Sequence, residues 1–77
     1  MRELVDFLVG QIVEKDSYEI VMVEDDNVVE IKVFVDQDKV AKIIGKSGRI
    51  AKSIRTLVKA ASQNSEKKYD IYIEERK

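Results

Sequence analysis

VAKIIGKSGRIAKSIRTL, at residues 40–57, contains two glycines between two runs of helical periodicity. The first run is a short helix that stops at Gly45, with an apolar stripe of Val40, Ile43 and Ile44. The second run is a longer helix that ends near residues 63–65, with a stripe of Ile50, Ile54, Leu57, Val58 and Ala61. The stretch therefore predicts two helices joined by the tight turn Gly45-Lys46-Ser47-Gly48.

The flanking sequence predicts one further helix and three strands. Apolar residues at three- and four-residue steps predict an amphipathic helix over about residues 2–14, with Gly10 inside it. Residues 18–23 and 28–35 predict an antiparallel hairpin around a polar turn at 24–27, and residues 69–73 predict the last strand. We expect Val29, Ile31, Val33 and Val35 on one face, and Asp36 or Asp38 as the cap of the next helix.

This order, α-β-β-α-α-β, predicts a two-layer α+β architecture in which three helices cover a three-stranded sheet. At 77 residues the chain is expected to form a single domain over residues 1–77. A domain of this size buries only about 60% of its unfolded surface, so its core is thin.

The composition argues against several functional classes. The chain has no Cys and no His, which removes disulfides, thiolate and imidazole metal sites, and the commonest general base. Ser47, Ser53 and Thr56 therefore have no base beside them, and we expect no enzyme, no catalytic residue, no metal and no cofactor. The first residues interrupt their apolar run with acids, so neither a signal peptide nor a membrane span is predicted, and we expect a cytoplasmic protein.

Charge is divided unevenly along the chain. The net charge is −1. Residues 1–38 have 3 basic and 11 acidic side chains, whereas residues 39–68 have 9 basic side chains and one acid, Glu66. The basic segment contains the glycine turn, which indicates a surface that faces a polyanion, although solvated helix faces of opposite sign are the alternative.

Three interpretations of the glycine turn are open to test. The simplest takes Gly45 as a helix C-cap and Gly48 as a turn residue without a ligand. A nucleotide P-loop would need glycine at position 40, which is Val40, and a preceding strand, so that interpretation fails. The third is a seat for a sugar–phosphate backbone, because the two glycines permit close approach and the following helix presents unpaired N–H groups.

The whole context resembles the KH domain. Its signature is an apolar pair before GxxG and an apolar residue two positions after it, here Ile43-Ile44, GKSG and Ile50. The element order resembles the type II, prokaryotic topology, and the resemblance covers essentially the whole chain. The length and the acidic N-terminal helix are similar to those of small bacterial proteins made of a single KH domain.

The resemblance implies a set of RNA-binding residues. Gly45, Lys46, Ser47 and Gly48 would hold backbone phosphates of about four nucleotides, with charge from Lys42, Arg49 and Lys52. Ile43, Ile44 and Ile50 would offer apolar surface under the bases, with a pure core role as the alternative for each. Lys39, Arg55 and Lys59 are interpreted as an outer electrostatic apron or as solvated.

The resemblance also implies a function and partners. We expect a small protein that binds single-stranded RNA weakly, with little sequence preference, because no aromatic residue lies in the basic segment. It implies a homodimer or pairing with a larger KH protein, an RNA-chaperone role, and effects on bacterial cell elongation and division, with no membrane and no small-molecule substrate. The alternative is a KH fold that mainly recruits a protein partner.

Overall fold

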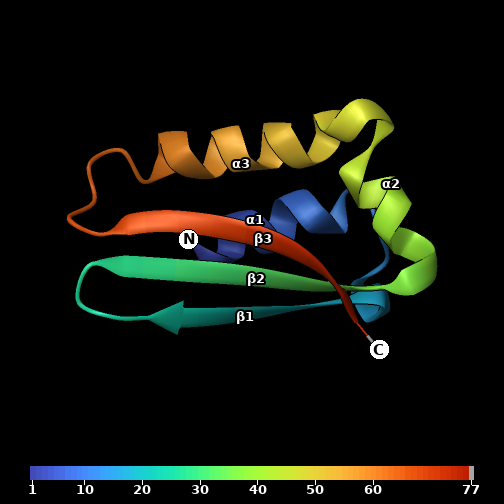
Figure 1. Cartoon of the computed structure of the whole chain (residues 1–77), viewed down its shortest axis with the longest axis horizontal. Helices are drawn as coiled ribbons and strands as arrows, with labels where there is room; N and C mark the ends of the chain where they lie inside the picture. Colours follow the sequence, from blue (N-terminus) through green and yellow to red (C-terminus); the bar gives the residue numbers. More distant parts are fainter. Residues whose placement is uncertain (77) are drawn as a thin grey trace.

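The computed structural model describes residues 1–76 and contains three helices and three strands in the predicted order (Figure 1). The helices are α1 (Arg2–Gly10), α2 (Val40–Ile44) and α3 (Arg49–Ala61), and the strands are β1 (Tyr18–Glu24), β2 (Val28–Asp36) and β3 (Lys68–Arg76). Short 3₁₀ turns lie at Lys15–Ser17, Gln37–Lys39 and Lys46–Gly48. The α+β prediction is confirmed. Within residues 1–76 no helix combines the length and apolar character that crossing a bilayer requires.

The sheet is mixed, with β2 in the centre. β1 and β2 pair antiparallel, with Ile20 opposite Val33, whereas β2 and β3 pair parallel, with Val33 opposite Ile73. Parallel neighbours cannot be joined by a hairpin and need a long crossover. Here α2, the glycine turn and α3 make that crossover, and α3 runs back along β3 in Figure 1.

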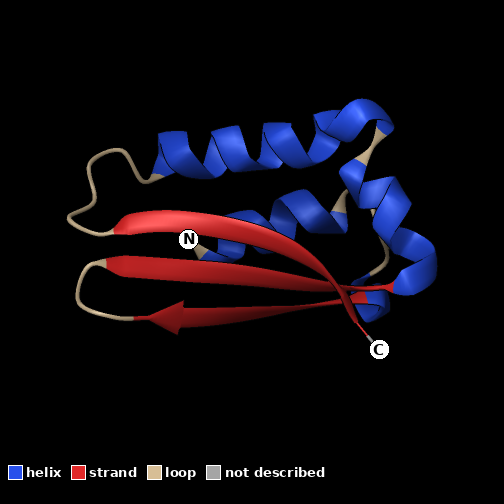
Figure 2. Cartoon of the chain, viewed as in Figure 1, coloured by secondary structure: helices blue, strands red, loops and turns tan. Residues whose placement is uncertain are grey.

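The core lies between the helices and one face of the sheet. Side chains at alternate positions of β2 are buried as predicted: Val29, Ile31, Val33 and Val35. The helices contribute Val5 and Val9 from α1, Ile43 from α2, and Ile54 and Val58 from α3. β3 crosses in front of α1 in Figure 2. Val21, Val23 and Tyr72 are exposed at positions that alternate with buried ones along β1 and β3, so they lie on the face of the sheet away from the core.

The first helix is shorter than predicted. It ends at Gly10 rather than near residue 14, and the chain turns through residues 11–13 so that Val13 still reaches the core. A Cβ at position 10 would lie 3.3 Å from the Tyr18 hydroxyl oxygen. Glycine both weakens the helix and permits this close approach of β1, which explains the early end.

The predicted cap of α2 is wrong. The N-cap position is Lys39, and neither Asp36 nor Asp38 makes a side-chain capping bond to α2. Asp36 lies opposite Arg76 in the parallel register, accepts a hydrogen bond from its Nε at 2.9 Å, and forms an ion pair with its Nη2 at 2.8 Å. The carboxylate that the sequence assigned to a helix end instead joins the ends of two strands.

The apolar stripe of α3 is narrower than predicted. Ile54 and Val58 are buried, and Ile50 packs partly against the core. Leu57 is 48% exposed, on the flank of the buried side. Ala61 is on the same side of the helix as Ile54 and Val58, but it is the last residue of α3 and is exposed. The prediction that these two residues are buried with the stripe was therefore wrong.

The hairpin turn was predicted correctly and is held by Asp25. Its carboxylate accepts hydrogen bonds from the backbone N–H groups of Asn27 at 2.8 Å and Val28 at 2.7 Å, and these bonds lower the pKa of Asp25. The start of β3 is attached to the same end of the sheet, because the Lys68 N–H donates to the Asn27 carbonyl and Lys67 forms an ion pair with Glu24.

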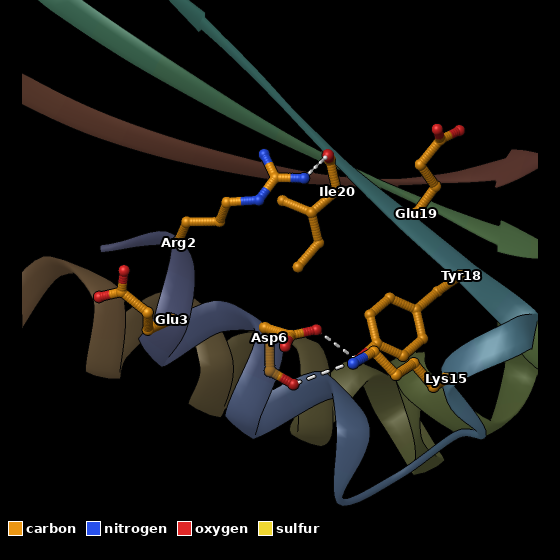
Figure 3. Close-up of a pocket in the computed structure, with 7 residues that line it drawn as sticks. All are labelled: Arg2, Glu3, Asp6, Lys15, Tyr18, Glu19 and Ile20. Atoms are coloured by element: carbon orange, nitrogen blue, oxygen red, sulfur yellow. Dashed lines mark hydrogen bonds between the residues drawn. The ribbon is translucent and has the colours of Figure 1, made fainter.

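Two polar contacts fasten α1 to the edge strand β1 (Figure 3). The buried Tyr18 hydroxyl donates to the Asp6 carboxylate at 2.6 Å, and the Arg2 guanidinium donates to the Ile20 carbonyl at 2.8 Å. Burial, followed by the hydrogen bond and the charge of Asp6, raises the pKa of Tyr18 to about 12. The neutral phenol is therefore the form that the fold stabilises.

We predict that Tyr18→Phe lowers the free energy of unfolding by about 2 kcal/mol at pH 8, because a hydrogen bond to a carboxylate is lost. The pKa of Tyr18 in the folded protein, about 12, exceeds the ordinary tyrosine value of 10.0. The wild-type contribution is therefore complete below pH 10 and is lost as pH rises from 10 to 12. Urea unfolding of both proteins between pH 8 and 11 measures this, and identical pH slopes for the two proteins would contradict it.

Candidate nucleic-acid interface

The Gly45–Gly48 turn has a backbone that glycine makes possible. Gly45 ends α2, where its N–H donates to the Ala41 carbonyl at 2.9 Å, and it has φ 78° and ψ 175°. Gly48 is the N-cap of α3 at φ 74°, and its N–H donates to the Gly45 carbonyl at 3.1 Å. Ser47, between them, is left-handed at φ 57° and ψ 25°, a conformation that few residues other than glycine adopt.

Gly45 and Gly48 have different surroundings in the structure. A Cβ on Gly45 would lie 2.6 Å from Cγ1 of Ile50 and 2.9 Å from its Cβ, so the turn is packed directly against the first turn of α3. A Cβ on Gly48 would meet nothing within 4 Å. Gly45 is therefore required for packing, whereas Gly48 leaves an open surface beside it.

A groove of about 590 Å³ begins at Gly48 and follows α3. We call it the basic groove, and its lining residues are Ile44, Gly48, Ala51, Lys52, Arg55, Thr56, Lys59 and Ile73. Ile44 and Ile73 supply apolar surface from α2 and β3, and Ile44 is 37% exposed. The charged members lie on α3 at helical spacing of three and four residues.

The charged side chains that line the basic groove are all positive. Its lining includes Lys52, Arg55 and Lys59 and no carboxylate. Within residues 1–76 the ion pairs are Lys67–Glu24 and Arg76–Asp36, so none of the three groove cations is neutralised by one. The pocket beside α1 in Figure 3 differs, because Glu3, Asp6 and Glu19 line it with Arg2 and Lys15. Of these two hollows, only the basic groove suits an anion.

The structure brings together only part of the predicted site. Ile44, Gly48 and Lys52 line the basic groove, and Lys46 and Ser47 are exposed on the turn beside it, as Lys42 is on α2. Arg49 does not line the basic groove but a neighbouring hollow of α3, which shares Lys52 and Thr56 with it. Ile43 is fully buried, and Ile50 packs on the core beneath Gly45, so both placements favour the core role.

Several lining residues were not assigned to the site by the sequence. The sequence predicts Arg55 and Lys59 in an outer electrostatic apron or simply in solvent, whereas in the structure they line the basic groove with Lys52. Residues 52, 55 and 59 are three and four positions apart, which places their side chains on one side of a helix. This spacing could have grouped Arg55 and Lys59 with Lys52 from the sequence alone. Ile73 had no such signal, because only the parallel pairing of β3 brings it beside α3.

The α-β-β-α-α-β order, the mixed sheet and the GxxG turn between two helices define a type II KH-like domain. A family model described as "KhpA/KhpB, KH domain" matches residues 2–73. The chain therefore belongs to the KhpA/KhpB KH-domain family.

Named relatives agree with this assignment. The RNA-binding protein KhpA of Clostridium perfringens is 40% identical over 76 residues, which cover 95% of this chain and 99% of the relative. The RNA-binding protein KhpA of Borreliella burgdorferi is 35% identical over 72 residues, with 92% and 88% covered. That of Aquifex aeolicus is 33% identical over 61 residues, with 78% and 77% covered. The relatives are named for RNA binding and for no enzymatic activity.

The turn predicts unequal effects of alanine at its two glycines. Gly45→Ala should lower the free energy of unfolding by about 3 kcal/mol. Alanine is strained in the backbone conformation of Gly45, and its Cβ would clash with Ile50. Gly48→Ala should cost only about 1 kcal/mol, because left-handed backbone is its sole penalty. Urea unfolding compares the two variants, and equal losses would show that Gly45 does not depend on its contact with Ile50.

Proposed function

We propose that this protein binds single-stranded RNA, with the Gly45–Gly48 turn on the backbone phosphates and the bases in the basic groove. Lys46 and Ser47 contact phosphates together with the backbone N–H groups of the turn. Lys42, Arg49 and Lys52 add positive charge, and Ile44 contributes apolar surface. The protein acts in the cytoplasm as an RNA chaperone on many transcripts, with low sequence specificity, and affects cell elongation and division in its bacterium.

The observation that carries this proposal is the run of unneutralised cations beside an open glycine turn. Lys52, Arg55 and Lys59 face a groove without a carboxylate, next to Gly48, whose missing Cβ leaves room for a sugar–phosphate backbone. The relatives named RNA-binding protein KhpA support RNA as the polyanion. Phosphate contacts then dominate the affinity, since no aromatic side chain lines the groove for stacking.

We predict that the double variant Lys46→Asp/Ser47→Asp binds a short single-stranded RNA at least tenfold more weakly than wild type. Asp tolerates the left-handed backbone at position 47, so the fold should persist. If four phosphates are contacted, wild-type affinity should fall about 50-fold between 50 and 200 mM salt, and the variant should show a shallower slope. Fluorescence anisotropy with a labelled oligonucleotide measures both quantities.

A matched control separates the turn from general electrostatics. Gln11→Asp/Lys15→Asp changes the charge by the same amount at exposed positions outside the basic groove. This control should keep most of the wild-type affinity. Equal affinities of the turn variant and wild type, with both proteins folded, would reject the assignment of the turn.

A single weak site gains from pairing, so we also propose a homodimer or a heterodimer with a larger KhpB-type KH protein. Linking two sites raises the apparent affinity without new contacts. Sedimentation equilibrium over a range of protein concentrations should show a reversible dimer. A strict monomer at the highest concentration would leave only the heterodimer, which mixing with a purified KhpB-type protein tests.

The second candidate is a module that mainly recruits a protein partner. The sheet face away from the core favours it, because Val21, Val23 and Tyr72 are exposed there. The turn variant Lys46→Asp/Ser47→Asp distinguishes the two candidate functions. A module that recruits a protein would keep its partner and its function in this variant, whereas an RNA-binding protein would lose its function.

A further inference from the structure

The side chains of the basic groove present hydrogen-bond donors and almost no acceptors. Lys52 and Lys59 each carry an ammonium group, and Arg55 carries a guanidinium, none of which can accept. The only side-chain acceptor in the lining is the Thr56 hydroxyl oxygen, whose hydrogen is donated to the Lys52 carbonyl at 2.9 Å. No Asp, Glu, Asn or Gln lines the groove.

The four bases differ in what they offer to such a lining. Uracil presents a keto oxygen at the position where cytosine presents an amino group, and guanine O6 stands where adenine has its N6 amino group. A keto oxygen accepts from Lys or Arg, whereas an amino group offers further donors to a surface of donors. An amino group that enters the groove away from Thr56 Oγ1 finds no side-chain acceptor, so it loses its bonds to water without replacement.

The peptide groups of β3 do not cancel the difference between keto and amino bases. β3 is an edge strand, so outward-facing peptide groups along it provide N–H and C=O groups together. A paired donor and acceptor can match the Watson–Crick edge of either a keto or an amino base. The side chains of α3 therefore decide between the two kinds of base.

We propose that the basic groove favours the keto bases uracil and guanine over the amino bases cytosine and adenine, with Arg55 as the main specificity-determining residue. Arg55 lies between Lys52 and Lys59 along α3, and its planar guanidinium holds donors in a fixed geometry that an ammonium lacks. The effect is a bias between base classes rather than a sequence code. This proposal rests on RNA binding in the groove, as proposed above.

The cleanest test compares eight-nucleotide oligouridine with oligocytidine at pH 7.5. The two have the same length and charge, and both are pyrimidines, so phosphate contacts contribute equally. We expect oligouridine to bind about three- to tenfold more tightly, near the low end of the discrimination given by a bidentate base contact, because uracil O4 is a single acceptor. An oligouridine with one central guanosine should likewise bind more tightly than one with a central adenosine.

Arg55→Gln tests the assigned residue. The guanidinium of Arg55 can only donate hydrogen bonds, whereas the glutamine amide has an NH₂ donor and a carbonyl acceptor. The variant can therefore bind either kind of base, and the ratio of uridine to cytidine affinity should fall toward one. Lys39→Gln is the matched control, because it removes the same charge outside the groove lining and should weaken both oligonucleotides without changing their ratio. Both positions lie away from the buried core, and circular dichroism checks the fold.

The outcomes separate the two proposals. Equal affinity of wild type for the two oligonucleotides, with binding still weakened by Lys46→Asp/Ser47→Asp, overturns the base preference and leaves RNA binding in place. Tighter binding of oligocytidine also overturns the preference. An unchanged ratio in Arg55→Gln removes Arg55 from the role. Failure of wild type to bind either oligonucleotide overturns both proposals.

Discussion

The parallel pairing of β2 with β3 is the constraint from which the position of the candidate site follows. Parallel neighbours require a crossover, and in this small chain the whole crossover consists of α2, the glycine turn and α3. The turn therefore lies beyond the end of β2, and α3 must run back beside β3. This arrangement brings Ile73 next to residues of α3 and forms the basic groove. The same register also pairs Asp36 with Arg76, which joins the two strands at the end where the crossover begins.

Charge follows the same division of the chain. The crossover and the loop after it contain nearly all of the uncompensated positive charge, whereas α1 and the hairpin are acidic. A polyanion that approaches the domain is attracted to α3 and repelled by the acidic elements, so the field orients the ligand before any contact forms. A net charge of −1 conceals this arrangement, because the sum cancels two surfaces of opposite sign.

The sequence predicted element types and order well, because periodicity and the glycine turn are local properties. It failed where a contact between distant residues decided the outcome. Gly10 is the last residue of α1, at the point where the Tyr18 hydroxyl approaches it, and Asp36 pairs with Arg76 across the two strands instead of capping α2. Leu57 fits the helical stripe by spacing, yet its exposure depends on how α3 sits on the sheet. The site shows the same limit, since helical spacing could have placed Arg55 with Lys52, but only the sheet register could add Ile73.

The two halves of the candidate site differ in rigidity. The turn is preorganised, because Gly45 packs on Ile50 and the left-handed backbone of Ser47 and Gly48 is set before a ligand arrives. Preorganised groups lose little entropy on binding, so the turn suits the sugar–phosphate backbone that all sequences share. Lys52, Arg55 and Lys59 are long and exposed, and ordering each costs about 1 kcal/mol on binding. That cost offsets much of each base contact. In the proposed RNA complex the rigid turn would therefore supply general affinity, and the flexible side chains would leave only a modest bias between classes of base.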